Sequence, residues 1–399
     1  MEWKEVRLGD VCEIITGFPF PGKKYSKEGI RVVRGDNVTI GNLRWDSEKD
    51  KRWNEPFDKT EYYSLQANDI VIGMDGSRVG KNKARIKKED LPLLLAQRVA
   101  CVRHNELAEQ DYLYYNIFSK KFIDYVNSIH TGSAIPHISQ KQIEDYKILL
   151  PDLETQRHIA SILSSLDRKI ELNNKINADL EEMAQAIFKN WFVDFEPFKN
   201  GKFVDSELGM IPEGWKVGRL EDIAEITMGQ SPAGNSLNEN REGMIFYQGS
   251  SDFGFRFPSI RVFTTEPKRL AVANSVLFSV RAPVGDINVA KEKCCIGRGV
   301  ASIKSKYGHD SYLFYTMKSL HKLFDSFDGE GTVFGSINKK TLSAIQILLP
   351  SDGIVEQFNN IASSFDNRIR SLSEENSRLS LLRDTLLPRL MSGEIEIPE

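Results

Sequence analysis

One glycine-containing segment comes close to a phosphate-binding loop, so it is the first candidate for chemistry. GFPFPGKK (Gly17–Lys24) follows the pattern G-x4-G-K, but Lys24 stands where such a loop needs a hydroxyl for magnesium. Pro19 and Pro21 also remove backbone N–H donors that the loop would offer to phosphate. The sequence therefore predicts no nucleotide site in this segment.

The other catalytic patterns are incomplete as well. GRG (Gly297–Gly299) misses the spacing of a dinucleotide-binding loop. PDLE (Pro151–Glu154) lacks the lysine of a metal-dependent nuclease site, and Asp152 is better placed to cap a helix. No metal-ligand spacing connects Cys12, Cys101, Cys294 and Cys295, and we expect the adjacent pair Cys294 and Cys295 to be free thiols in a strand. We therefore expect no catalytic residue, metal or cofactor in this chain.

Two pairs of polar segments do recur, and both suit contacts with DNA. TGSAIPHISQK (Thr131–Lys141) and EGTVFGSINKK (Glu330–Lys340) each combine glycine, hydroxyl or amide side chains and a basic end. VVRGDNV (Val32–Val38) and FYQGSSDF (Phe246–Phe253) place different polar side chains around a shared glycine. Arginine can bond guanine, an amide side chain can bond adenine, and basic or backbone groups can bind phosphates.

These segments and several basic clusters supply the candidate DNA-binding residues. The candidates are Lys23, Lys24, Arg34, Asn37, Arg78, Lys81, Lys83, Thr131, Ser133, His137, Lys141, Gln248, Ser250, Ser251, Arg256, Arg261, Thr332, Lys339 and Lys340. Each segment is also compatible with an ordinary polar turn, and each basic cluster with solvated surface charge. The residues alone leave both interpretations open.

The elements that position these residues belong to a long internal repeat. WKEVRLGDVCEIITG begins at Trp3 and WKVGRLEDIAEITMG begins at Trp215, which is 212 residues later. The tetrapeptide ILLP ends at Pro151 and again at Pro350, 199 residues later. The changing offset is what loops of different length would produce. A whole unit of roughly 200 residues therefore occurs twice, which is unlike a solenoid of short repeats.

Each unit is mixed before its ILLP and helical after it. The first parts contain short β-branched runs, glycine and proline, while the second parts show apolar positions seven residues apart. This heptad pattern predicts two long helices that pair as a coiled coil, with Leu166 toward Leu386 and Ile187 toward Phe365 if they run antiparallel. An amphipathic helix packed only on its own domain is the alternative. The predicted inter-helix seam is Ile162, Leu166, Asn173, Ile176, Leu180, Met183, Ile187, Ile361, Phe365, Leu372, Leu379, Leu382 and Leu386.

Composition limits the class of protein. The chain has 399 residues, 40% hydrophobic and 27% charged, which is typical of a globular protein with more than one domain. The net charge of −3 excludes a polybasic protein that binds nucleic acid by bulk charge alone. The N-terminal residues MEWKEVRLGD do not form a signal peptide, and apolar runs are too short to cross a membrane. We therefore expect a cytoplasmic protein without membrane partners.

Three segments resemble a known family. NWFVDFEPF and DSELGMIPEGWK, between Asn190 and Lys216, resemble the junction between the halves of specificity subunits of type I restriction-modification systems. LLPRLMSGEIEI (Leu386–Ile397) resembles the C-terminal end of these subunits, and WKEVRLGDV (Trp3–Val11) resembles the start of their recognition domains. Because family recognition residues vary, the resemblance transfers the loops as locations and no individual base contact.

The resemblance implies two similar target recognition domains, at 1–150 and 201–350. Two conserved spacer helices, at 151–200 and 351–399, would form an antiparallel coiled coil between them, giving an α+β fold with a pseudo-twofold internal repeat. It also implies a non-catalytic DNA-binding subunit whose partners are two methylation subunits and restriction subunits. S-adenosylmethionine and ATP would then bind to those partners.

The expected function combines the repeat with this resemblance. Two different recognition domains predict a bipartite and asymmetric double-stranded DNA target, with one half-site for each domain and an unread gap between them. The chain would position methyltransferase and restriction subunits on that target. The alternative is a protein-binding scaffold whose duplicated domains hold partners other than DNA.

Overall fold

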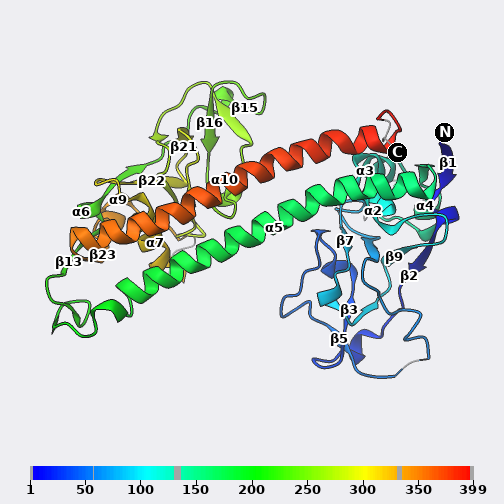
Figure 1. Cartoon of the computed structure of the whole chain (residues 1–399), viewed down its shortest axis with the longest axis horizontal. Coiled ribbons are helices and arrows are strands. Elements are labelled where there is room, and N and C mark those ends of the chain that lie inside the picture. The colour runs from blue at the N-terminus through cyan, green and yellow to red at the C-terminus, as the bar shows by residue number, and fades with distance from the viewer. Residues whose placement is uncertain (1–2, 57, 130–135, 330–334, 396–399) are drawn as a thin grey trace. The chain divides into compact units, whose positions relative to one another are not determined.

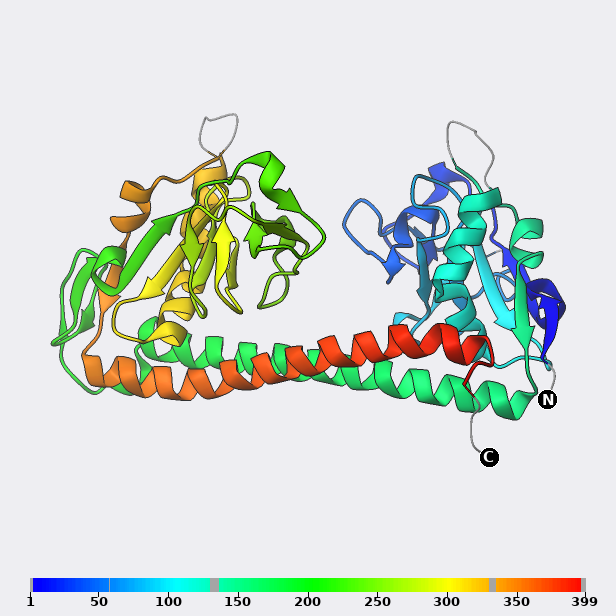
Figure 2. The same ribbon diagram turned by 90° about the horizontal axis from the view of Figure 1, so that it is seen from above.

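The computed structural model describes residues 3–56, 58–129, 136–329 and 335–395. The chain divides into two compact units (Figure 1). Unit 1 comprises Met1–Leu172 and Glu375–Glu399, and unit 2 comprises Asn173–Glu374. Each unit contains one mixed domain and one half of each of two long helices. In each unit the mixed domain lies on one side of the helices (Figure 2). Within the described ranges, no helix is both long enough and apolar enough to span a membrane.

The mixed domain of unit 1 contains three small sheets. A five-stranded sheet has the order β2 (Cys12–Thr16), β9 (Val99–His104), β6 (Ile70–Gly73), β7 (Lys83–Arg85) and β4 (Ile40–Gly41). A three-stranded sheet has the order β5 (Arg52–Trp53), β3 (Ile30–Val33) and β8 (Leu93–Leu95). The first and last strands, β1 (Lys4–Arg7) and β10 (Lys147–Leu150), pair with each other. The helices are α1 (Leu8–Val11), α2 (Gln110–Phe118), α3 (Lys120–Ile129) and α4 (Gln140–Glu144).

The central strand of the larger sheet is buried on both faces. Ile70 and Ile72 of β6 join one apolar cluster with Leu113 and Phe122 of the helices. Val71, between them, joins a second cluster with the strands of the smaller sheet. A strand covered on both sides needs apolar residues at every position, which explains the uninterrupted run IVIG.

Unit 2 repeats this domain. Its sheets have the orders β14-β22-β19-β20 and β15-β17-β16-β21-β18, and β13 pairs with β23 as β1 pairs with β10. The strands are β11 (Phe203–Val204), β12 (Ile211–Pro212), β13 (Lys216–Arg219), β14 (Ala224–Met228), β15 (Leu237–Asn238), β16 (Met244–Tyr247), β17 (Val262–Thr264), β18 (Leu270–Ala271), β19 (Val276–Ser279), β20 (Ile287–Val289), β21 (Cys294–Ile296), β22 (Val300–Ser305) and β23 (Gln346–Leu349). The short helices are α6 (Leu220–Ile223), α7 (Asp310–Ser319), α8 (His321–Gly329) and α9 (Lys339–Ser343).

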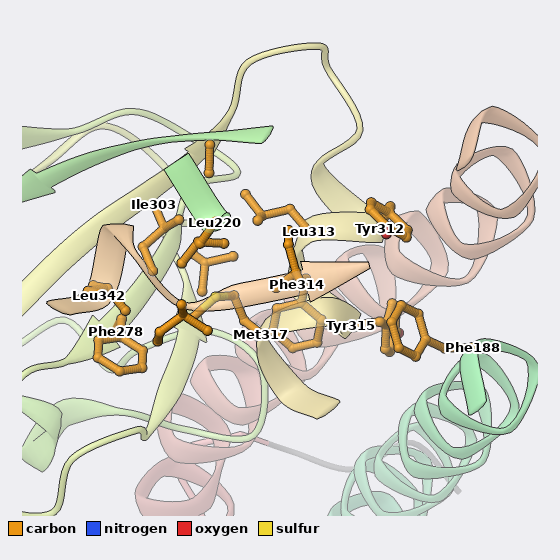
Figure 3. Close-up of a cluster of buried hydrophobic side chains, with 14 of the residues drawn as sticks. Phe188, Leu220, Phe278, Ile303, Tyr312, Leu313, Phe314, Tyr315, Met317 and Leu342 are labelled. Atoms are coloured by element: carbon orange, nitrogen blue, oxygen red, sulfur yellow. The ribbon is translucent and has the colours of Figure 1, made fainter. Parts of the chain in front are cut away.

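The core of unit 2 joins the sheet to the long helices. Leu313 and Tyr315 of α7 lie between strand residues such as Phe278 and the helix residue Phe188 (Figure 3). Repeat-equivalent strands also pair in the same register, since Lys4 faces Leu150 and Lys216 faces Leu349. The predicted α+β fold with an internal repeat is confirmed.

The two long helices are α5 (Leu153–Phe192) and α10 (Asp352–Met391). Each has 40 residues, which corresponds to about 60 Å at 1.5 Å per residue. Asp152 caps α5, because its carboxylate accepts a hydrogen bond from the Thr155 backbone N–H at 2.9 Å. Both helices continue without interruption from one unit into the other.

Contacts within each unit show that the helices are antiparallel. In unit 1, Leu163 near the start of α5 shares an apolar cluster with Leu390 near the end of α10. In unit 2, Phe188 near the end of α5 lies 5.5 Å from Phe358 near the start of α10, measured between ring centroids. The predicted coiled coil is confirmed. The helices also pack on the mixed domains of their own units. Pairing between the helices and packing on the domains therefore occur together.

Of the thirteen predicted seam residues, nine are buried or half-buried and four are exposed. The main positions of the seam are buried or half-buried: Leu166, Asn173, Leu180, Ile187, Phe365, Leu372, Leu379 and Leu386. Ile176 is half-buried. The other four residues were assigned wrongly, because their side chains are exposed: Ile162 (37%), Met183 (50%), Ile361 (37%) and Leu382 (46%).

The residues that pack in place of these four lie one position later in the sequence. They include Leu163, Ala184, Ala362 and the half-buried Arg383. The prediction chose the largest apolar side chains, whereas closely packed helices accept small or paired polar side chains at these places. The exposed residues also repeat, since Ile162 and Met183 are each 199 residues before their counterparts Ile361 and Leu382.

Candidate nucleic-acid interface

Several loops of unit 1 meet at the same end of the sheets. Backbone hydrogen bonds run from Ala96 N to Val33 O (3.0 Å), from Met74 N to Arg98 O (2.9 Å) and from Ile138 N to Met74 O (2.9 Å). They join the loops that follow β3 and β6, the turn before β9 and the segment before α4. The sequence selected all of these segments for DNA contacts except the turn before β9.

The joined loops line an open groove of about 770 Å³. Four arginines line it, Arg34, Arg44, Arg78 and Arg98, together with polar side chains such as Gln97. Two aspartates, Asp36 and Asp75, also line it. The groove is therefore basic on balance and rich in groups that can bond phosphates or base edges.

The sequence prediction found only part of this groove. Arg34 and Arg78 were among the candidates, whereas Arg44, Gln97 and Arg98 were missed. The repeat held the signal for two of them, because AQRV (Ala96–Val99) leads into β9 as GRGV (Gly297–Val300) leads into β22.

Arg34 is held at the edge of the groove by local contacts. Its guanidinium pairs with Asp36 at 2.8 Å and lies 5.7 Å from the centroid of the Tyr25 ring. An aromatic face beside a guanidinium gives a flat surface on which a base or sugar can lie.

Three candidates are internal, so their assignment to DNA contact was wrong. Asn37 is buried, and its amide nitrogen donates to the backbone oxygens of Arg44 and Lys49, both at 3.0 Å. It stabilises a turn, which is the usual role of a short amide side chain after a strand. The other two, Lys83 and Arg256, are buried cations.

Lys83 lies among aromatic rings. Its ammonium donates to Gly80 O at 2.9 Å and lies 5.0 and 5.4 Å from the ring centroids of Phe122 and Phe118. Burial lowers the pKa of Lys83 to about 7, because the charged form loses its hydration.

Arg256 is the centre of a buried ionic cluster. It pairs with Glu181 of α5 at 3.0 Å and with Asp366 of α10 at 2.5 Å. It also donates to the Tyr315 hydroxyl at 2.9 Å. A sequence gives no sign that a basic residue faces two carboxylates from distant helices, which is why this residue looked like a phosphate contact.

The other described candidates lie at or near the surface. In unit 1, Lys24 pairs with Glu55 at 2.8 Å, His137 contacts Asp75, and Lys141 pairs with Asp145 at 2.9 Å. Ser250 is half-buried, and seven further candidates are exposed: Lys23, Lys81, Gln248, Ser251, Arg261, Lys339 and Lys340. Thr131, Ser133 and Thr332 lie outside the described residues. DNA contact by the accessible residues stays a prediction.

Unit 2 has the same three backbone hydrogen bonds between its loops, but the loops carry other side chains. Hydrogen bonds run from Gly297 N to Tyr247 O (2.8 Å), from Val280 N to Gly299 O (3.0 Å) and from Ile337 N to Val280 O (3.1 Å). These bonds are the counterparts of the three in unit 1. Gln248 accepts a hydrogen bond from the Ser231 hydroxyl at 3.0 Å where unit 1 has Arg34.

A close backbone contact explains the GRG sequence. A Cβ atom at Gly299 would lie 2.5 Å from the backbone oxygen of Gln248, so a side chain there would clash. The glycine at this position allows the two loops to pack closely.

The cysteines are poorly suited to nucleophilic chemistry. All four are free and buried. Burial raises the pKa of Cys12 and Cys294 to about 12, so their thiolate forms are scarce at neutral pH. Among the residues that the structure describes, no group of three or more His, Cys, Asp or Glu side chains could hold a metal ion.

Comparisons with known proteins agree on one family. Residues 1–182 and 212–381 match the family described as the type I restriction modification DNA specificity domain. The chain is 31% identical to a putative type I restriction enzyme MjaX specificity subunit of Methanocaldococcus jannaschii, over 99% of this chain and 94% of the relative. It is 26% identical to the HindI specificity subunit of Haemophilus influenzae, over 71% of this chain and 77% of the relative.

A solved structure has a similar fold. It is the crystal structure of the type I restriction-modification system S subunit from M. genitalium, with a TM-score of 0.60 and 15% sequence identity. The likeness covers 100% of this chain and 97% of the other.

Proposed function

Because the chain belongs to the family of type I restriction-modification DNA specificity subunits, we propose that each mixed domain binds one half of a bipartite, asymmetric DNA target. The family implies recognition of DNA sequence. The division of the target between the domains is the proposal, and its main support is the pair of matching loop frames.

The matching loops support this proposal because their backbone hydrogen bonds are equivalent and their side chains differ. Arg34 in unit 1 corresponds to Gln248 in unit 2, and both lie at the end of a strand beside a shared glycine. Arginine suits guanine and glutamine suits adenine in the major groove. Two domains with the same fold and different side chains would read two different half-sites.

The long helices suit a spacer. Each is continuous over 40 residues, and both connect the units. A length of about 60 Å is sufficient to separate half-sites by one turn of DNA, ~34–36 Å. The unread gap between the half-sites would therefore follow from the length of the helices.

The exposed apolar residues of the long helices are suited to contacts with partner subunits. Ile162 and Leu382 are exposed in unit 1, and Met183 and Ile361 are exposed in unit 2. Each unit thus carries the same two repeat-equivalent positions, which would provide one docking face for each of two methylation subunits. Restriction subunits would join this assembly.

The chemistry would belong to these partners. Methylation subunits would bind S-adenosylmethionine, and restriction subunits would bind ATP. The purified chain alone would then neither methylate nor cleave DNA, and methyl transfer by the chain free of partners would contradict this assignment.

Binding of the full chain to a labelled random-sequence duplex tests DNA recognition. We expect affinity to fall steeply between about 50 and about 200 mM salt, because phosphate contacts release counterions. A scaffold for other partners would show no such binding. Methylome sequencing of the host with and without the gene should then reveal one bipartite motif that depends on the gene, and a continuous motif would contradict the division into half-sites.

A further inference from the structure

Unit 1 holds a polar trio, Arg98, Asp75 and His137, that the equivalent described positions of unit 2 do not repeat. Arg98 pairs with Asp75 at 2.9 Å, and the other carboxylate oxygen of Asp75 contacts His137. The three residues stand on neighbouring backbone segments, because Met74 N bonds Arg98 O and Ile138 N bonds Met74 O. The equivalent positions in unit 2 hold Gly299, Arg281 and Ser336.

Stability does not explain an arginine at position 98. Its backbone is left-handed, with φ of 65°, a conformation that is unfavourable for a residue with a Cβ atom. Its side chain is 72% exposed, and an exposed ion pair contributes little to folding. A strained and exposed residue at the lip of a groove is more consistent with a binding role.

The groove supplies the setting for that role. Arg34, Arg44 and Arg78 line the same groove and provide positive charge for the DNA backbone. Asp75 also lines it and is only 22% exposed. A carboxylate beside DNA is repelled by phosphates, so its presence there favours a base edge as the neighbour of the Arg98–Asp75 pair.

The hydrogen-bonding groups of the Arg98–Asp75 pair are complementary to those of a guanine–cytosine base pair. A guanidinium donates two hydrogen bonds to O6 and N7 of guanine, and a carboxylate accepts from the N4 amino group of cytosine. We propose that Arg98 reads a guanine in the half-site bound by unit 1, while Asp75 orients Arg98 and favours the cytosine paired with that guanine. This inference rests on the proposed function, because it assumes that the groove binds duplex DNA.

Selection of duplexes from a randomised pool by the full-length chain tests the proposal. The wild-type chain should enrich a bipartite motif with guanine at one position of one half-site. Arg98→Gln should change that position from guanine to adenine, because glutamine pairs with adenine. Arg98→Lys keeps the charge without the bidentate geometry, so it should lose at least about tenfold of the discrimination while non-specific binding stays nearly unchanged.

Two further variants separate reading from positioning. Asp75→Asn should weaken the preference for guanine without replacing it. Arg241→Gln is the matched control, since Arg241 is also exposed and left-handed, with φ of 65°, and lies in unit 2. It should leave every position of the motif unchanged.

The outcomes distinguish this inference from the proposed function. If the wild-type chain enriches a motif and Arg98→Gln enriches the same motif, Arg98 does not read a base and the inference is wrong. If the wild-type chain enriches no sequence, the proposed function itself fails. Near-ultraviolet circular dichroism of the variants checks that the fold around the groove is retained.

Discussion

At the scale of single residues, basic side chains divide into those that hold the domains together and those that face outward. Arg256 belongs to the first group, and its cluster ties the mixed domain of unit 2 to both helices. The hydroxyl of Tyr315 donates to Asp366 at 3.1 Å, and in unit 1 the hydroxyl of Tyr115 donates to Asp167 at 2.7 Å. The aspartates are 199 residues apart, so the repeat uses the same anchor twice.

Removal of one charge from the buried cluster should destabilise unit 2. Glu181 is 4% exposed and pairs with Arg256 and Lys318. Glu181→Ala should cost roughly 3–5 kcal/mol of unfolding free energy, because the buried Arg256 loses one of its two paired carboxylates and the half-buried Lys318 loses its contact with Glu181. Denaturant unfolding measures the loss. Glu182→Ala, at the exposed neighbouring position, should cost no more than about 0.5 kcal/mol, and equal losses for both variants would contradict the role of the cluster.

Lys83 should make the stability of unit 1 depend on pH. Burial lowers its pKa from 10.5 to about 7, so the unfolded chain binds more protons than the folded chain between these values. The free energy of unfolding therefore rises with pH across this window. Below pH 7 the full cost of burying the charged Lys83 is present. Lys83→Met should stabilise unit 1 by about 1–3 kcal/mol near pH 6.5 and by less near pH 9.5.

Thermal unfolding at the two pH values checks this difference. The rings of Phe118 and Phe122 favour the charged ammonium, so they make the penalty smaller than burial alone would. Lys81→Met, at an exposed position, serves as the control and should change stability by no more than about 0.5 kcal/mol at either pH. A gain from Lys83→Met that is larger at high pH would show that the sign is wrong.

The residue scale is also where prediction from sequence was weakest. The structure brings Arg34 and Arg78 to one groove, and DNA contact by their loops stays a prediction. Whether a given basic side chain points outward depends on contacts that the sequence does not reveal, as Lys83 and Arg256 show. Both face groups from elements distant in the chain, and no local pattern marks them as internal.

At the scale of elements, periodicity predicted most of the architecture. The seven-residue spacing located both long helices and the main seam, because one face of a helix must be apolar wherever it is buried. At Ile162 and Met183 the predicted seam was misplaced by one residue, since Leu163 and Ala184 are buried instead. Periodicity reports where large apolar residues occur, and it cannot say whether another helix of the chain or a partner covers them.

Two leucines of α10 should separate these two roles. Leu372 is 1% exposed and Leu382 is 46% exposed. Leu372→Ala should cost roughly 2–5 kcal/mol of stability, because it leaves a cavity between packed elements. Leu382→Ala should change stability by no more than about 0.5 kcal/mol and should weaken binding of the methylation subunit.

Unfolding experiments and co-purification with the methylation subunit measure the two effects independently. A loss of stability for Leu382→Ala as large as that for Leu372→Ala would place Leu382 back in the packed seam, as the sequence predicted.

At the scale of the whole molecule, the internal repeat leads us to expect that the two halves act separately in DNA recognition. Each mixed domain has its own sheets and its own core, as the apolar clusters of unit 1 and unit 2 show. Replacement of residues 1–150 by the first domain of another family member should therefore change one half of the target. The other half and the unread gap should stay the same.

Methylome sequencing with the chimaera and its intact parents is the measurement for this replacement. The boundary falls directly before α5, which begins at Leu153, so both helices keep their full length. A simultaneous change in both half-sites would contradict independent reading by the two domains.

The pairing of β1 with β10, and of β13 with β23, bears on how such proteins change over generations. Each mixed domain enters and leaves through adjacent antiparallel strands, and similar sequences flank both copies. Homologous recombination between these flanks would transfer an intact domain in one event. A lineage could thus acquire a new specificity without passing through intermediates in which single mutations have spoiled the old one.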